Sequence, residues 1–508
     1  MRAPTPQDRL ELVQLGADFA EGVDGERVLV QLRPQDLQAL PPRFEAQVQP
    51  PLSGLDEHFH SLEEIEEELR QLAQQPGVEL VQLGQSVEGR AILGLRMGQA
   101  EAPRWRILGA HHGDEASSSE LALLLAHTLL EERSDLLEDR EVWLVPVVNP
   151  DGYVSTSRNN ANEVDLNRNY SHEWKDTVFS GEAPFSEPEV RAVRRLSAYA
   201  PPSFGLSLHS GAENIGYPWN HTKTDTPDEG GLLELAEVYG EACEQPGFYV
   251  TNGADWYVTY GDTNDWSLGL QGSWDFTLEV SQTKSPDEDT LQEALEHHLP
   301  ATLALLEQSP RARGRVVDAS TGRPIPAELS LDRDSSPWVT DPETGRWARW
   351  LDTGVYTLSV SAPGYLSQEV ELRVHASEPG ELELELQPGA LQEQALEPAL
   401  VSRSEEQVWL QAPGSPQSLM FSRPGFDPLE VEHTDQGYLL DPSLLAAGAW
   451  TVSSVGGPGP EASSSATPRA APPSPRFPWT STSNCGVRAS AWAPGPGCCT
   501  GPTGRCSR

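Results

Sequence analysis

The spacing of hydrophobic positions changes several times along the chain, and each change predicts a different kind of element. From Ser61 onward, leucine and isoleucine recur at helical spacing over residues 62–72, Ser61 and Glu64 have the spacing of a capping box, and Pro76-Gly77 ends the run. Apolar runs typical of buried strands then alternate with further helical segments. The predicted strands are residues 78–83, 91–95, 104–110, 142–148, 204–208 and 274–280, and the predicted helices are residues 117–131, 187–199 and 231–244. This alternation predicts an α/β fold whose mixed, mostly parallel sheet is flanked by helices.

After residue 309 the pattern changes to short alternating runs separated by Thr-Gly and Pro-Gly turns. Runs at 314–317, 327–331, 355–360 and 368–374 have the spacing of a small all-β sandwich, and the same style continues to residue 455. Beyond it, a tail rich in Pro, Ser, Gly and Cys is expected to be disordered. The expected units are an appended or prosegment-like region (1–54), the α/β domain (55–308), a β-sandwich (311–388), a second small β unit (389–455) and the tail (456–508).

Composition narrows the choice of partners. The chain has 508 residues with 77 acidic and 35 basic side chains, a net charge of -42, which argues against nucleic acid or an anionic membrane as the main partner. No window approaches 18 consecutive apolar residues, so we expect no membrane-spanning helix. The first ten residues are polar and lack the apolar region of a secretory signal, so the compartment stays open. Four of the five cysteines lie in the tail, and the main domains therefore rely on a core rather than on disulfides.

The first candidate for chemistry is a His-Gly-Asp-Glu stretch (112–115) between a predicted strand and a predicted helix. His112 and Glu115, three residues apart at such a turn, can face one point and supply nitrogen and oxygen ligands to zinc. The same spacing recurs at residues 60 and 63 and at residues 375 and 378, so taken alone it more often marks a surface pair. A third ligand is available in His209, which ends an apolar strand where a strand edge opens into a site, although a lone histidine there is more often an ordinary hydrogen-bonded one. His-Glu-His with an open fourth position is the ligand set of hydrolytic zinc.

Between these candidates lies a segment rich in asparagine that carries two arginines, Arg158 and Arg168. It contains Asn-Pro-Asp-Gly-Tyr (149–153), Arg-Asn-Asn (158–160) and Asp-Leu-Asn-Arg-Asn (165–169). Guanidinium groups bind carboxylates through two parallel hydrogen bonds, so the pair points to recognition of an anion. Two surface ion pairs explain the same composition equally well.

The ordered set of these motifs, with Phe-Ser-Glu-Pro-Glu (185–189) and the strand-ending histidine, resembles the zinc metallocarboxypeptidases. Within that family the chain looks most like the regulatory branch typified by carboxypeptidases E, N and D, in which a transthyretin-like β domain follows the catalytic domain. Residues 314–374 are similar to that domain. The resemblance covers about residues 55–375. It implies a zinc exopeptidase with one Zn²⁺ per chain that acts on peptide or protein C-termini, and a secreted or periplasmic location; we expect a monomer.

Carried over by position, the resemblance implies a role for each motif residue. The zinc ligands are His112, Glu115 and His209; Asp165 orients the first histidine; Arg158 stabilises the oxyanion; Asn167 and Arg168 hold the terminal carboxylate; Tyr257 caps the substrate; and Glu279 is the general base. Read as a strand, residues 274–280 place Glu279 on the face opposite Trp274, a position from which a glutamate more often simply meets water. A tyrosine close in sequence to tryptophans, such as Tyr257, more often packs against neighbouring side chains than contacts a substrate.

The substrate pocket departs from the family pattern. Basic-residue specificity in the regulatory branch relies on an acidic residue after a Tyr-Pro dipeptide, whereas here Tyr-Pro-Trp (217–219) is followed by Asn220. Seven residues after Tyr257, at a second pocket position, stands Asn264. Asp262 and Asp265 lie close enough in sequence to substitute, so specificity stays open. Two alternative functions also remain: a related zinc amidohydrolase acting on cell-wall peptides or N-acyl amino acids, and a catalytically inactive binding module.

Overall fold

The computed structural model describes residues 54–388 apart from 101, 333–336, 342, 363–364 and 376–379, most of residues 1–47, and the strands between 399 and 455. Tail residues 456–508 and Glu378 lie outside the described residues. Within the described part, no helix combines the length and the hydropathy that crossing a bilayer requires.

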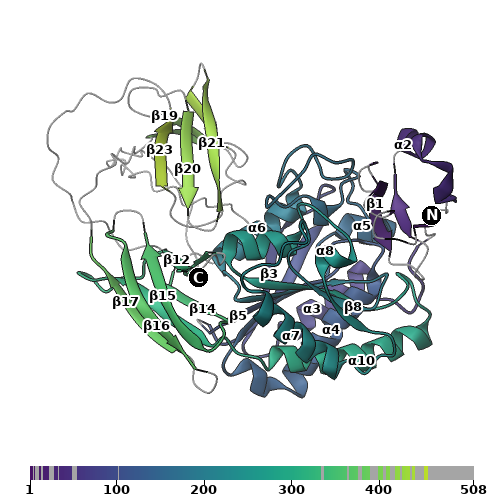
Figure 1. Ribbon diagram of the computed structural model, residues 1–508, viewed down its shortest axis with the longest axis horizontal. Coiled ribbons are helices and arrows are strands. Elements are labelled where there is room, and N and C mark those ends of the chain that lie inside the picture. Colours follow the sequence, from purple (N-terminus) through teal and green to yellow (C-terminus); the bar gives the residue numbers. More distant parts are fainter. Residues whose placement is uncertain are drawn as a thin grey trace, which may run out of the picture.

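An eight-stranded sheet has the strand order β3-β4-β6-β5-β7-β10-β8-β9. Figure 1 shows its labelled strands β3, β5 and β8 within the helix-rich part of the molecule. Four of its seven neighbouring pairs are parallel (β6/β5, β5/β7, β7/β10 and β8/β9), so the predicted mixed α/β sheet is confirmed. The strands are β3 (Val78–Gln85), β4 (Ala91–Gly98), β5 (Arg104–Leu108), β6 (Glu141–Val145), β7 (Phe204–His209), β8 (Asn214–Tyr217), β9 (Tyr249–Asn252) and β10 (Trp274–Glu279).

Helices cover both faces of this sheet because its strands are apolar on both sides. In β6, Val142 and Leu144 belong to the larger core cluster, whereas Trp143 and Val145 belong to a second one on the opposite face. Packed on the first face are α3 (Leu62–Leu72), α4 (Ala116–Glu131), α7 (Glu229–Ala242) and α10 (Glu288–Leu306). On the other face lies α6 (Pro188–Tyr199). The result is three layers with the sheet in the middle.

Several predicted boundaries differ from the structure. The strands predicted to reach residues 110 and 148 end at Leu108 and Val145, because the chain turns at Ala110, which has a φ of 44°, and because Pro146 cannot donate a ladder hydrogen bond. The helix predicted over 231–244 spans Glu229–Ala242. The strands β8 and β9 and the 19-residue α10, which contains Pro300, were not predicted from the sequence pattern.

Two sheets follow the α/β unit and share one hydrophobic core. The three-stranded sheet is β14-β11-β17 and the four-stranded sheet is β13-β12-β15-β16, formed by β11 (Ala312–Asp318), β12 (Glu328–Leu331), β13 (Trp338–Val339), β14 (Arg346–Arg349), β15 (Gly354–Ser361), β16 (Gln368–Val374) and β17 (Gly380–Leu386). Ion pairs join this unit to the first: the buried Arg349 pairs with Asp228 at 2.8 Å, and the partly buried Arg104 pairs with Asp341 at 2.5 Å.

A further six-stranded sheet has the order β18-β19-β22-β21-β20-β23. Its strands are β18 (Ala399–Arg403), β19 (Val408–Gln411), β20 (Ser418–Arg423), β21 (Phe426–Thr434), β22 (Gly437–Leu440) and β23 (Thr451–Val455). The predicted all-β character after the α/β unit is therefore confirmed, while the exact limits of the units stay predictions.

The N-terminal region forms a small unit beside the α/β domain (Figure 1). It contains the strand pair β1 (Asp18–Glu21) and β2 (Leu29–Gln31), helix α2 (Pro34–Ala39) and the short helix η1 (Pro42–Phe44). Its own cluster of buried apolar residues packs against Tyr257, and the Asn159 amide donates to Gln31 Oε1 at 3.1 Å. This unit therefore contacts the rim of the region where the candidate site residues lie.

Candidate active site

The candidate site lies at the carboxyl ends of the central parallel strands. Strands β7 and β10 are neighbours in parallel register, so their last residues, His209 and Glu279, stand side by side. Strand β5, on the other side of β7, leads into the turn that carries His112 and Glu115. This turn needs glycine at position 113, because a Cβ there would lie 1.9 Å from the backbone of Gly152. The topology thus brings distant segments to one edge of the sheet.

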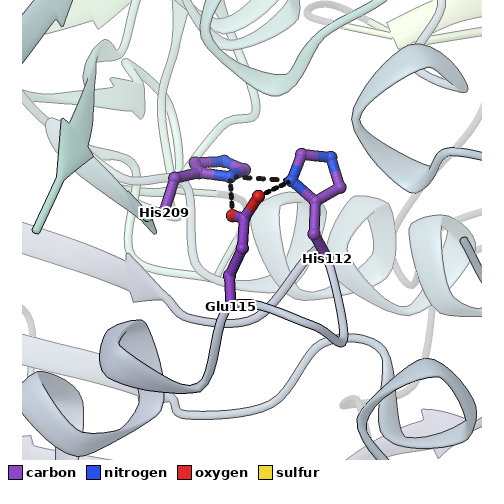
Figure 2. Close-up of side chains that lie close together, drawn as sticks. All are labelled: His112, Glu115 and His209. Carbon is purple, nitrogen blue, oxygen red and sulfur yellow. Dashed lines mark hydrogen bonds and ion pairs between the residues drawn. The ribbon is translucent and has the colours of Figure 1, made fainter. Parts of the chain in front are cut away.

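His112, Glu115 and His209 converge on one point (Figure 2). His112 Nδ1 lies 2.9 Å from Glu115 Oε1 and 3.1 Å from His209 Nδ1, which in turn lies 2.9 Å from Glu115 Oε2. All three side chains are buried. Ligands in a tetrahedral zinc site stand about 3.3 Å apart, since zinc–nitrogen bonds are about 2.0–2.1 Å long. The two imidazoles and the carboxylate therefore fit a zinc ion in both donor type and separation.

Asp165 forms a hydrogen bond with the ring nitrogen of His112 that does not face the other two ligands. Its Oδ1 lies 3.0 Å from His112 Nε2, which leaves Nδ1 facing Glu115 and His209. Arg158 pairs with Asp165 Oδ2 at 2.8 Å, and its Nη1 lies 3.1 Å from His112 Nδ1. Burial opposes ionisation of Asp165, but the charges of Arg158 and His112 outweigh it and hold the pKa of this carboxyl well below its usual value. Such a carboxylate fixes the tautomer and orientation of a metal-binding imidazole.

Lys284 is a site residue that sequence analysis did not identify. Its ammonium group is buried and lies 2.9 Å from Asp114 Oδ2 and 3.1 Å from Glu115 Oε1. Burial alone would raise the pKa of Glu115, yet His112 and Lys284 hold it well below its usual value. Lys284 is one of only three lysines in the chain, which was the one signal available in the sequence.

The cavity next to the three ligands is lined by charged groups of both signs. Asn167 and Arg168 belong to the short helix η3 (Leu166–Arg168), which Asp165 caps by accepting from the Asn167 backbone at 2.8 Å. Also facing the cavity are His112, Glu115, Arg158, His209, Ser210, Gly211, Gly216, Asn220, Gly253, Trp256, Tyr257, Thr259, Asp262, Thr277 and Glu279. Of the site residues predicted from the sequence, all line the cavity except Asn264 and Asp165, which lies behind His112.

Asn264 lies behind the cavity wall, where its Oδ1 accepts from Thr277 Oγ1 at 2.9 Å. Asp262, two residues earlier, does line the cavity and is the N-cap of α9 (Thr263–Trp266). The Asp262 carboxylate accepts from Thr259 Oγ1 at 2.7 Å, from Asn220 Nδ2 at 3.0 Å and from the Asp265 backbone at 2.9 Å. An acidic side chain is therefore present in the wall.

The second His-x-x-Glu pair of the sequence forms no comparable group. His60 contacts Glu120 at 2.8 Å and Glu68 at 3.6 Å, both on helices of the outer layer, and the capping box of Ser61 and Glu64 starts α3 beside it. Context rather than spacing therefore separates the pair at 112 and 115 from the pair at 60 and 63.

Three comparisons bear on this geometry. The sequence profile of the zinc carboxypeptidase family matches residues 65–301. The chain is 30% identical over 378 residues to the human carboxypeptidase N catalytic chain, covering 60% of this chain and 80% of that protein. It is 29% identical over 361 residues to human carboxypeptidase D, covering 62% of this chain but only 26% of that protein. A solved structure of bovine thrombin-activatable fibrinolysis inhibitor in complex with tick carboxypeptidase inhibitor matches 49% of this chain and 96% of that chain, with 23% identity and a TM-score of 0.46.

Proposed function

The chain belongs to the zinc carboxypeptidase family, and on this premise we propose that it is a zinc-dependent metallocarboxypeptidase that hydrolyses the C-terminal peptide bond of peptides or proteins. The observation that carries the proposal is the convergence of His112, Glu115 and His209 within 3.1 Å of one another, beside a cavity lined by Arg168 and Glu279. Hydrolysis needs the three metal-ligand side chains and a base such as Glu279, and restriction to a chain terminus needs a cation such as Arg168.

His112, Glu115 and His209 are the residues that would hold zinc. A zinc ion bound there supplies Lewis-acid chemistry: it polarises a carbonyl group and lowers the pKa of water. Asp165 keeps His112 in the tautomer whose Nδ1 faces the other two ligands, and Lys284 balances the charge of Glu115.

Glu279 is proposed as the group that moves the proton. It ends β10 directly beside His209 and lines the cavity, which supports a role in taking a proton from water and delivering it to the leaving amine. Arg158, whose guanidinium lies against His112 and Asp165, is proposed to stabilise the oxyanion that develops on the scissile carbonyl.

Asn167 and Arg168 are proposed to bind the free carboxylate of the substrate, and Tyr257 to close over it. A planar guanidinium donates two parallel hydrogen bonds to a carboxylate, which an amidated or internal peptide bond cannot accept in the same way. Because Asp262 contributes a carboxylate to the wall that Asn220 also lines, we infer that a cationic terminal side chain is preferred.

The test is a time course with paired peptides that differ only in a free or an amidated C-terminus, read by mass spectrometry with and without a chelator. Zinc-dependent release of single residues from the free form alone is expected. Equal cleavage of the amidated form would rule out the proposed recognition of the free C-terminal carboxylate. Release only from peptidoglycan stem peptides would favour the amidohydrolase alternative.

A further inference from the structure

A second group of side chains of the kinds that bind metals lies beside the candidate-site cavity. His172, Glu173 and His221 each offer one ligand atom, and these atoms lie within 4.8 Å of one another. In the part of the chain that the structure describes, this group and the one at His112, Glu115 and His209 are the two clusters of that kind. We propose that His172, Glu173 and His221 bind a second divalent transition-metal ion, Zn²⁺ or a similar first-row ion.

The local backbone brings two neighbouring side chains to one side. On an extended chain, residues 172 and 173 would point in opposite directions. Here the chain turns instead: the Trp174 backbone N–H donates to the Ser171 carbonyl at 3.1 Å, and Glu173 has a φ of 50°, in the left-handed region that glutamate seldom adopts. The turn therefore makes it possible for an imidazole and a carboxylate from adjacent residues to face the same ion.

His221 has the hydrogen-bond partner that metal-binding histidines characteristically have. Its Nδ1 lies 2.6 Å from Asp265 Oδ2, and its backbone N–H donates to the same oxygen at 2.9 Å. A carboxylate bound to one ring nitrogen fixes the tautomer and presents the other nitrogen, Nε2, as the ligand. Asp265 thus stands to His221 as Asp165 stands to His112, although it contacts Nδ1 rather than Nε2.

His172 is held in place by its packing. Its ring stacks on Trp219 with 5.2 Å between centroids and meets the His221 ring edge to face at 5.5 Å. On another side it lies over Gly269, where a Cβ would come within 2.5–2.8 Å of three ring atoms. Gly269 belongs to the π-helix η4 (Ser267–Gln271), a rare element that is often found at functional sites. The absence of a side chain at 269 is what leaves room for this imidazole.

The types of ligand atom indicate which ion would bind, and the exposure of the ligands indicates whether it can exchange. Two imidazoles and one carboxylate suit borderline metals such as Zn²⁺, Co²⁺ or Ni²⁺ better than Mg²⁺ or Ca²⁺, which favour oxygen ligands. Glu173 is exposed and the two histidines are half-buried, so remaining positions are open to water and the ion can exchange. This differs from the other cluster, in which all three ligands are buried.

An ion at this place would connect the segment after η3 with the segment after β8. Through Asp265 it would also reach the cavity wall, because Asp265 Oδ1 accepts from the Asn220 backbone at 2.8 Å and the Asp265 backbone donates to Asp262. Asn220 and Asp262 both line the cavity. Occupancy of the second site is therefore expected to stiffen the wall that contacts the substrate side chain.

The experiment is metal binding by the full-length protein, measured without any peptide, so that its result does not depend on the proposed activity. The chelator-treated double variant His112→Ala, His209→Ala lacks the first cluster and is titrated with Zn²⁺ by indicator competition and with Co²⁺ by visible absorption. One equivalent is expected to remain. Adding His221→Gln is expected to remove it, whereas His58→Gln, a half-buried histidine beside the Pro286 carbonyl, is expected to leave it unchanged.

A second variant, Glu173→Gln, replaces an exposed side chain outside the core. It tests the proposal even if the histidine variant fails to fold. It is expected to weaken Zn²⁺ binding in the double variant at least 10-fold, and Asp265→Asn is expected to weaken it 10–100-fold, as for other partners of metal-binding histidines. A double variant that binds no ion, or a Glu173→Gln protein with unchanged affinity, would overturn the proposal.

Discussion

Replacing Asp262 with asparagine is predicted to remove the proposed preference for a cationic terminal residue and leave neutral substrates almost unaffected. The Asp262 carboxylate is 1% exposed, lines the cavity and accepts three hydrogen bonds, from Thr259, Asn220 and the Asp265 backbone. Asparagine keeps the size and shape of the side chain. The change therefore removes one negative charge from the wall and little else.

The magnitude follows from the low exposure of this carboxylate. A cation about 4 Å away gains about 4 kcal/mol of Coulomb energy at an effective dielectric constant of about 20, and part of this is offset by removing both charges from water. Hydrogen bonds to charged groups contribute about 1.5–3 kcal/mol net, which corresponds to a fall of about 10- to 150-fold in kcat/KM for C-terminal Lys or Arg.

The assay compares kcat/KM for peptides ending in Arg, Lys, Leu and Phe. Asp255→Asn is the matched control, because Asp255 is an exposed residue that pairs with Lys223 and does not line the cavity. The reasoning would be refuted if Asp262→Asn lowered kcat/KM equally for all four peptides, since that pattern would indicate a purely structural role for the carboxylate.

Three further predictions concern other residues. Glu279→Gln should lower kcat by about 10²- to 10⁴-fold while zinc content, measured by atomic spectroscopy, stays that of the parent protein, because in the proposed mechanism this residue moves a proton and is not one of the three ligands. Lys284→Met should weaken zinc binding about 10- to 100-fold in chelator competition, because the Glu115 carboxylate loses the ammonium group that orients it. Burial raises the pKa of Glu189 to about 7 from an ordinary 4.5, so its neutral form stabilises the fold at low pH and this contribution is lost as pH rises through 7. Chemical unfolding at pH 5 and pH 8 should therefore show a loss of at most about 3 kcal/mol at the higher pH, and Glu189→Gln should abolish that loss.

The sequence predicted well those parts of the site that lie at the ends of strands. His209 and Glu279 close apolar runs whose period of two shows which side chains share a face, and the register of β7 and β10 then places them together. The same reasoning located His112, since a turn from a buried strand into a helix exposes its side chains at the sheet edge.

The spacing of apolar residues did not predict the positions of side chains that lie on loops and short helices. Asn264 was expected in the pocket, but α9 begins at Thr263 and turns Asn264 inward toward Thr277, while its cap Asp262 faces the cavity. The single turn of α9 therefore directs Asn264 away from the cavity and leaves Asp262, two residues earlier, facing it. Lys284 reaches Asp114 across 170 positions of sequence, and no local pattern encodes that contact.

Diffraction from zinc-loaded crystals at the zinc absorption edge tests the central claim most directly. We predict an anomalous peak about 2.0–2.2 Å from His112 Nδ1, His209 Nδ1 and a Glu115 oxygen, with Glu279 facing the same space. A map without a peak among these three side chains, from protein that still releases C-terminal residues, would contradict the account.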